Sequence, residues 1–113
     1  MDILFKSIIV NQITDIQTLA VKNIEIYRNT EVSETIKNDY MKSVLAQVVV
    51  DLSSLISELT SNPDSTGEMI VDLQKVLNNL ILSEINIGSS NIKMKSTTKI
   101  MDDLTGIIKA HLN

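Results

Sequence analysis

Apolar side chains recur at intervals of three and four residues through most of this 113-residue chain, and this spacing constrains its fold most strongly. Residues at such intervals lie on one face of an α-helix. The pattern predicts four helices, over about 2–28, 33–61, 66–87 and from about 90 to the C-terminus. Their expected buried stripes are Ile9, Ile13, Ile16, Ala20, Ile24 and Tyr27; then Val44, Val48, Leu52, Leu55, Ile56 and Leu59; then Met69, Ile70, Leu73, Val76, Leu77, Leu80 and Ile81; and finally Ile92, Ile100, Leu104, Ile107 and Ile108.

Residues that favour helix ends separate the four segments. Asp2 suits the N-terminus of the first helix, because its side chain can accept a backbone hydrogen bond there. Ser33 can cap the second helix, and Glu34 in its first turn favours the helix dipole. Gly88 is suited to end the third helix, and a residue in 89–91 can cap the fourth.

The stretch SNPDSTGEM, residues 61–69, contains the only proline of the chain. Pro63 cannot continue the preceding helix, and it disfavours helical geometry at the residue before it. Ser65 and Glu68 have the spacing of a capping box, which predicts that the next helix starts there. A phosphate-binding loop would need the pattern GxxxxGK[ST], which this stretch lacks. We therefore interpret 61–69 as a connector.

Short connections between amphipathic helices favour antiparallel neighbours. The sequence thus predicts one all-α domain over residues 1–113, folded as a four-helix up-down-up-down bundle with two longer N-terminal helices. The alternative is an α+β fold, because apolar and polar residues alternate around a four-residue turn and can form a small β-hairpin at 84–95. Hydrophobic residues make up 43% of the chain, which is enough to form a core.

Composition excludes several classes of function. The chain has no cysteine, so disulfides, thiolate catalysis and cysteine-bound metals are excluded. Its net charge of −4 opposes binding to nucleic acid or anionic lipid. Uninterrupted apolar runs reach only three residues, and the N-terminus lacks the features of a signal peptide. We expect a soluble, cytoplasmic protein that binds neither nucleic acid nor membrane, and the many Ile, Asn and Lys residues suggest a bacterial or phage source.

Residues with catalytic chemistry are few and scattered. His111 is the only histidine, and at the chain end it is interpreted as a partly buried helix residue rather than a base or ligand. Asp102 and Asp103 are adjacent, so their side chains diverge by about 100° around a helix and cannot face each other. The serines of the second helix lack the GxSxG turn of a hydrolase. We expect no enzyme activity, no catalytic residue, no cofactor and no metal site.

The predicted second and third helices carry unexpectedly little charge opposite their buried stripes. A surface helix normally places charged residues there, so these sides are candidate contact faces. The alternative is that they are isolated exposed apolar residues, as in every protein. The candidate interface consists of Ala46, Val50, Ser53, Ser57, Val71, Asn78, Leu82 and Ile85.

These faces predict a protein-binding module that forms a homodimer or a higher homo-oligomer. Such a module would act as an adaptor, chaperone or inhibitor. The alternative is a structural subunit of a virion or secretion assembly, which would form polymers rather than a closed dimer.

Overall fold

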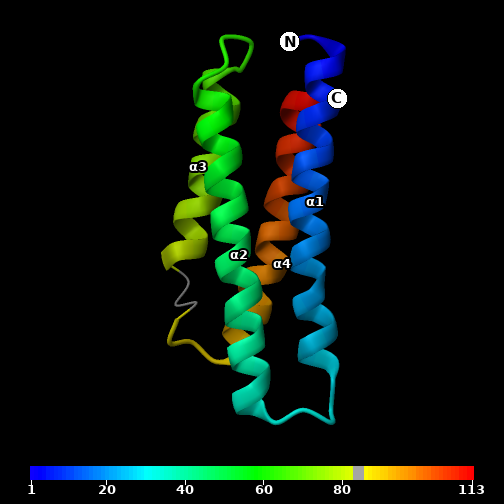
Figure 1. The fold of residues 1–113 in the computed structure, drawn as a ribbon, viewed down its shortest axis with the longest axis vertical. Helices are drawn as coiled ribbons and strands as arrows, with labels where there is room; N and C mark the ends of the chain where they lie inside the picture. Colours follow the sequence, from blue (N-terminus) through cyan, green and yellow to red (C-terminus); the bar gives the residue numbers. More distant parts are fainter. Residues whose placement is uncertain (83–85) are drawn as a thin grey trace.

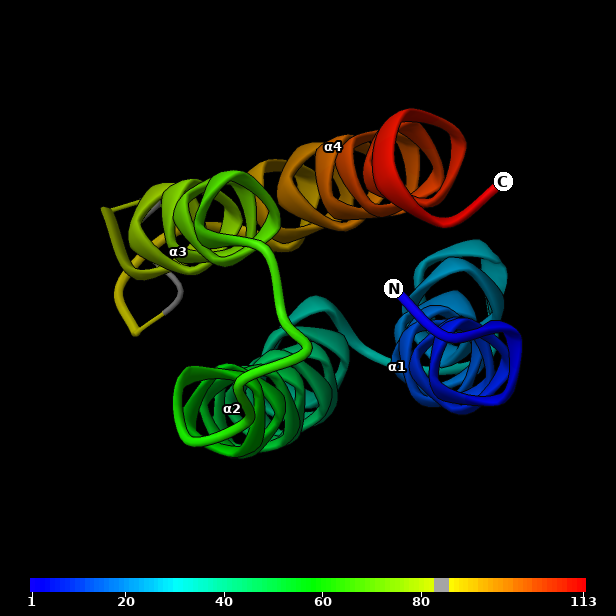
Figure 2. The same ribbon diagram turned by 90° about the horizontal axis from the view of Figure 1, so that it is seen from above.

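Successive helices run in opposite directions along a bundle 47 Å long in the computed structural model, which describes residues 1–82 and 86–113 (Figures 1 and 2). The helices are α1 (Ile3–Arg28), α2 (Glu34–Thr60), α3 (Gly67–Leu82) and α4 (Ser90–Ile107), and α4 continues into a π-helical turn, η1 (Ile108–Leu112). The all-α class, the up-down-up-down order and the two longer N-terminal helices are confirmed.

The β-hairpin alternative at 84–95 is wrong. Residues 86–89 form a turn, residues 90–95 belong to α4, and the described part of the chain contains no strand. Residues 84 and 85 lie outside the described residues. The third helix was predicted to extend to Ile87, but Asn86 and Ile87 lie in the turn, so α3 is shorter than its apolar pattern suggested.

Side-chain caps fix the helix starts where the sequence predicted them in three cases. Asp2 Oδ1 accepts a hydrogen bond from the backbone N–H of Leu4 at 3.2 Å, at the start of α1. Ser33 Oγ accepts from Ile36 N at 3.4 Å, and Ser89 Oγ accepts from the third residue of α4 at 3.3 Å. Each cap satisfies one of the backbone donors that a helix leaves free at its N-terminus.

The connector before α3 differs from its prediction in one detail. Thr66, not Ser65, caps the helix: Thr66 Oγ1 accepts from Met69 N at 3.4 Å. Because α3 begins at Gly67, Glu68 falls at the second helical position and cannot close a capping box with Ser65. Asn62 Oδ1 accepts from Asp64 N at 2.9 Å and shapes the turn instead.

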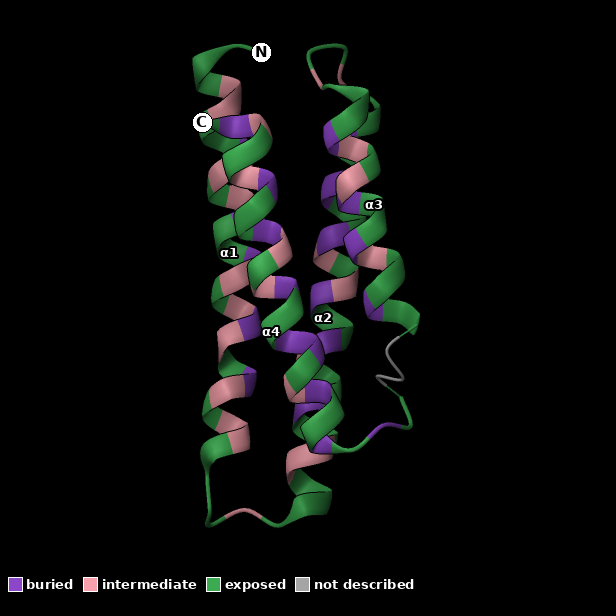
Figure 3. Ribbon diagram, turned by 180° about the vertical axis from the view of Figure 1, so that it is seen from behind, coloured by how far each residue is buried: buried purple, intermediate pink, exposed green. Residues whose placement is uncertain are grey.

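The core is aliphatic along most of the bundle, and most of the predicted stripe residues are buried in it (Figure 3). Two predictions were wrong, because Ile81 and Ile92 are 53% and 37% exposed. Six further predicted residues are only half-buried: Ile24, Tyr27, Val44, Ile70, Leu77 and Ile108.

The bundle has two unlike ends. The terminal end, formed by residues 1–15, 48–75 and 102–113, contains both chain termini (Figure 1). The Lys93 end is formed by the described residues of 16–47 and 76–101. Every buried residue of the terminal end is apolar, whereas the Lys93 end contains all five buried polar or charged residues: Asn23, Ser90, Lys93, Ser96 and Thr97.

Candidate interaction surface and buried polar cluster

The outward side of α2 carries no charge over about half of the helix. Between Lys42 and Glu58 every exposed residue of α2 is uncharged. Among these, Val50 is the largest apolar side chain and is 55% exposed. At the margin, Gln47 donates a hydrogen bond to the half-buried Asp51 at 2.8 Å. We call this surface the α2 outer face; it consists of Ser43, Ala46, Gln47, Val50, Ser53, Ser54 and Ser57.

The outward side of α3 is more mixed. Val71 and Leu82 are 48% and 78% exposed, and Asn78 lies exposed between them. Exposed Glu68 and Lys75 interrupt this side with charge. It therefore offers apolar side chains to a partner, but no continuous uncharged surface.

The structure thus leaves the predicted interface residues accessible, in two groups. The four on α2 share the α2 outer face, and three of the four on the third helix lie along the outward side of α3. The fourth, Ile85, lies outside the described residues. Whether these surfaces bind a partner stays a prediction.

By length and mean hydropathy alone, α2 also resembles a membrane-spanning helix, with a mean hydropathy of 1.3 in its most apolar window. One third of that window is buried inside the bundle, including Leu45, Val48 and Leu52. Packing between helices therefore accounts for part of the apolar content of α2.

A polar cluster crosses the interior of the Lys93 end. The amide Nδ2 of Asn23, on α1, donates to the backbone carbonyl of Met41 on α2 at 3.3 Å and to Thr97 Oγ1 on α4 at 3.2 Å. Thr97 Oγ1 in turn donates to the carbonyl of Lys93 at 2.9 Å. Asn23 Oδ1 is buried without a hydrogen-bond partner. One amide thus connects three helices.

Lys93, in the first turns of α4, is only 1% exposed. Its Nζ donates to the carbonyl of Gly88, in the turn that leads into α4. Burial lowers the pKa of Lys93 from its ordinary 10.5; the nearby charge of Lys42 lowers it further, and Asp39 opposes both effects. Beside it, Ser90 Oγ donates to Glu34 Oε1 and joins the start of α4 to the start of α2.

Sequence reasoning missed this cluster although the signal was present. Extending the stripe of Ile107 and Ile100 toward the N-terminus, in steps of three and four, leads to Thr97 and Lys93. The prediction followed apolar residues only and chose Ile92 instead. Asn23 was missed for the same reason. It follows Ala20 by three residues on the buried face of α1, but the prediction took the apolar Ile24 instead.

A charged groove of about 350 Å³ lies between α3 and α4. Its lining includes the apolar Val76 and Ile107, with Lys75 and Asp102 among its charged residues. Two further lining residues, Lys99 and Asp103, form an ion pair with 3.2 Å between Nζ and Oδ2.

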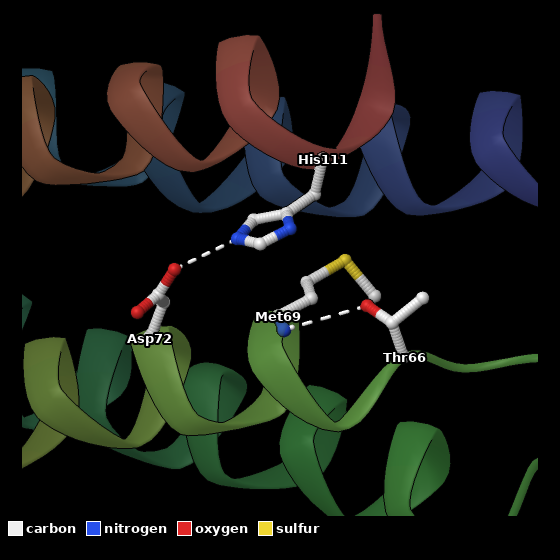
Figure 4. A network of polar contacts seen from close by, with 4 residues as sticks. All are labelled: Thr66, Met69, Asp72 and His111. Atoms are coloured by element: carbon white, nitrogen blue, oxygen red, sulfur yellow. Dashed lines mark hydrogen bonds and ion pairs between the residues drawn. The ribbon is translucent and has the colours of Figure 1, made fainter.

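His111 contacts α3 from the C-terminal turn (Figure 4). Its ring reaches from the C-terminal turn toward α3, where Nε2 lies 2.7 Å from Asp72 Oδ2. The half-buried position matches the prediction of a helix-end residue. The contact is an ion pair only when the imidazole is protonated, and it ties η1 to α3.

A second groove, of about 240 Å³, lies between α1 and α2. Its lining includes Asp15, Asp51 and Glu58, and Gln12 Nε2 donates to Glu58 Oε2 at 3.2 Å. Within the described residues, no group of three or more Asp, Glu, His or Cys side chains is arranged to hold a metal ion.

Comparison with known proteins yields no relative. No family model, no curated protein and no solved structure matches this chain. Any statement of function must therefore come from the surfaces and the interior of the bundle itself.

Proposed function

We propose that this chain is a non-enzymatic protein–protein interaction module that associates with copies of itself and acts as an adaptor, chaperone or inhibitor. The observation that carries the proposal is the α2 outer face, whose exposed residues are all uncharged. Charged side chains normally occupy this side of a surface helix because they favour contact with water. Their absence over about 15 residues supports a surface that is covered when the protein functions.

The residue types of this face favour another helix over lipid as the covering partner. Four serine hydroxyls and the Gln47 amide would lack hydrogen-bond partners in hydrocarbon, which is costly. Against a second helix, they can pair across the contact. Small side chains also let two helices approach to about 8–10 Å, at which Val50 would be enclosed.

Charge substitutions on the two outward sides test this proposal. We expect Val50→Glu to convert the associated protein into a 12.6 kDa monomer in sedimentation velocity at tens of micromolar. Leu82→Glu should do the same only if the outward side of α3 takes part in the contact. A carboxylate in a desolvated contact is strongly unfavourable unless it reaches water. Both variants should remain helical by circular dichroism, because neither residue is buried in the bundle.

Thr14→Glu is the matched control, because it adds the same charge at an exposed residue of α1, on neither outward side. It should leave the association unchanged. If the protein still associates in both test variants, neither the α2 outer face nor the outward side of α3 forms the contact. Cosedimentation of the unmodified protein with neutral lipid vesicles, lost in Val50→Glu, would instead indicate that lipid covers α2.

A structural subunit of a virion or secretion assembly is the second candidate, supported by apolar side chains at both ends of the bundle. Ile3 and Leu4 at the terminal end are 83% and 67% exposed, and Ile87 at the Lys93 end is 83% exposed. End-to-end contacts of this kind do not close and build filaments. Light scattering that keeps growing with concentration, beyond the mass of a dimer, would favour this candidate.

A further inference from the structure

We infer that the α2 outer face binds the same face of a second copy, with the two α2 helices antiparallel and the twofold axis passing beside Val50. This inference rests on the proposed self-association and specifies its geometry. Three features of the molecule carry it: where the uncharged surface lies, how charge is distributed between the two ends, and how residue size varies along α2.

The first feature selects α2 over α3. Every exposed residue of α2 from Ser43 to Ser57 is uncharged, and the half-buried Asp51 lies at the margin, bonded to Gln47. On α3, in contrast, exposed Glu68 and Lys75 interrupt the outward side. A helix pair formed through α3 would have to place these charges at or beside the contact. The α2 pair avoids that cost, because desolvating a charge is unfavourable unless it is paired.

The second feature is electrostatic and fixes the direction. The terminal end carries nine of the 14 acidic residues and three of the ten basic ones. The Lys93 end carries seven basic and four acidic residues among those described. A parallel pair would place acidic end beside acidic end. An antiparallel pair places each acidic end beside the more basic end of its partner, which is favourable.

The same asymmetry appears locally and fixes the register. Lys42 and Glu58 bound the uncharged surface, and each lies eight residues from Val50. A twofold axis beside Val50 therefore brings Lys42 of one copy level with Glu58 of the other. In a parallel pair, each would be level with its own like-charged equivalent.

Residue size is compatible with this register. Val50 meets its own equivalent at the centre, Ala46 lies level with Ser54, and Ser43 lies level with Ser57. All residues around the central valine except Gln47 are small, so close approach of the two backbones meets little steric resistance. The contact from residue 43 to residue 57 is only about 21 Å long. Such an interface is at the small end of the known range, so a weak, concentration-dependent dimer is expected.

Single cysteines report this geometry directly, because the chain contains none of its own. A disulfide requires Cα atoms within about 4.4–6.8 Å of each other. At tens of micromolar in a glutathione redox buffer, Val50→Cys should form a covalent dimer with itself. Ser43→Cys and Ser57→Cys should not cross-link separately, because about 21 Å of helix separates the equivalent positions in the antiparallel pair. Mixed together, these two variants should form a covalent dimer.

Lys95→Cys, exposed on α4, measures the background from random collisions. Efficient cross-linking of Ser43→Cys alone would show a parallel pair and overturn the inference. An associated protein in which none of the α2 cysteines exceeds background would place the contact elsewhere, which overturns the inference but leaves self-association standing. A protein that sediments only as a 12.6 kDa monomer would overturn both the inference and the proposed self-association.

Discussion

The terminal end and the Lys93 end of the bundle are built on different principles, although the same helices pass through both. At the terminal end, four helical segments enclose only apolar side chains, including Ile13, Leu52 and Leu73. At the Lys93 end, a lysine, an asparagine and three hydroxyl-bearing residues are buried. At the Lys93 end the described part of α3 stops at Leu82, while α1, α2 and α4 continue (Figure 1).

The two ends contribute differently to the fold: one mainly stabilises the bundle, and the other mainly fixes how its helices are aligned. Apolar packing stabilises the terminal end without selecting strongly among similar arrangements, since hydrophobic contacts are not directional. The Asn23 amide, in contrast, satisfies its donors only when Met41 of α2 and Thr97 of α4 lie at particular positions. We interpret the polar cluster as fixing the mutual register of three helices, at some cost in stability.

The largest effect is expected in the apolar core. Leu52 is fully buried at the terminal end, so Leu52→Ala should lower the free energy of unfolding by about 2–5 kcal/mol, through lost burial and an unfilled cavity. Leu82→Ala makes the same chemical change at a residue 78% exposed and should alter it by less than about 0.5 kcal/mol. Urea unfolding by circular dichroism measures both, and equal losses would contradict the assigned core.

The second-largest effect is expected at Lys93, where the free energy of unfolding should depend on pH. Because the pKa of Lys93 is lowered in the folded protein, the unfolded chain binds more protons between that lowered value and 10.5. Stability therefore rises with pH in this window, relative to a variant without the group, and the cost of burying the charge is fully present below it.

Lys93→Met removes the titrating group and should abolish this rise. The test compares its free energy of unfolding with that of the parent in steps from pH 7 to pH 10.5. Lys95→Met is the control, because it removes a lysine two residues away at an exposed position and should follow the parent. A constant difference between Lys93→Met and the parent over the whole range would show that Lys93 carries its proton at no cost.

The smallest effect is expected at Asn23. Asn23→Leu removes an amide whose Oδ1 is buried without a partner, and Thr97 Oγ1 keeps its bond to the Lys93 carbonyl. Replacing such a polar group with an apolar side chain of similar volume is often neutral or stabilising, so we expect a change within about 1 kcal/mol. Asn23→Ala is the companion variant and should lose more, because it leaves a cavity. A loss in Asn23→Leu as large as that in Leu52→Ala would show that the amide is essential for stability.

The terminal end was largely predictable from sequence, and the Lys93 end was not. The three-and-four spacing of Leu52, Leu55 and Leu59 marks residues whose burial depends only on being apolar. Lys93 and Thr97 occupy equivalent positions on α4, but their burial depends on partners that pattern reasoning does not bring together: the Gly88 carbonyl and the Asn23 amide. The uncharged character of the α2 outer face was predictable, since Ala46, Val50, Ser53 and Ser57 recur on one side of the helix.

A sedimentation equilibrium series on the unmodified protein, from about one to several hundred micromolar, tests the central claim most directly. If the α2 outer face is a contact between copies, the weight-average mass should rise from 12.6 kDa toward twice that value and level off there. A mass that stays at 12.6 kDa over the whole range would contradict self-association, and the uncharged side of α2 would then need another explanation.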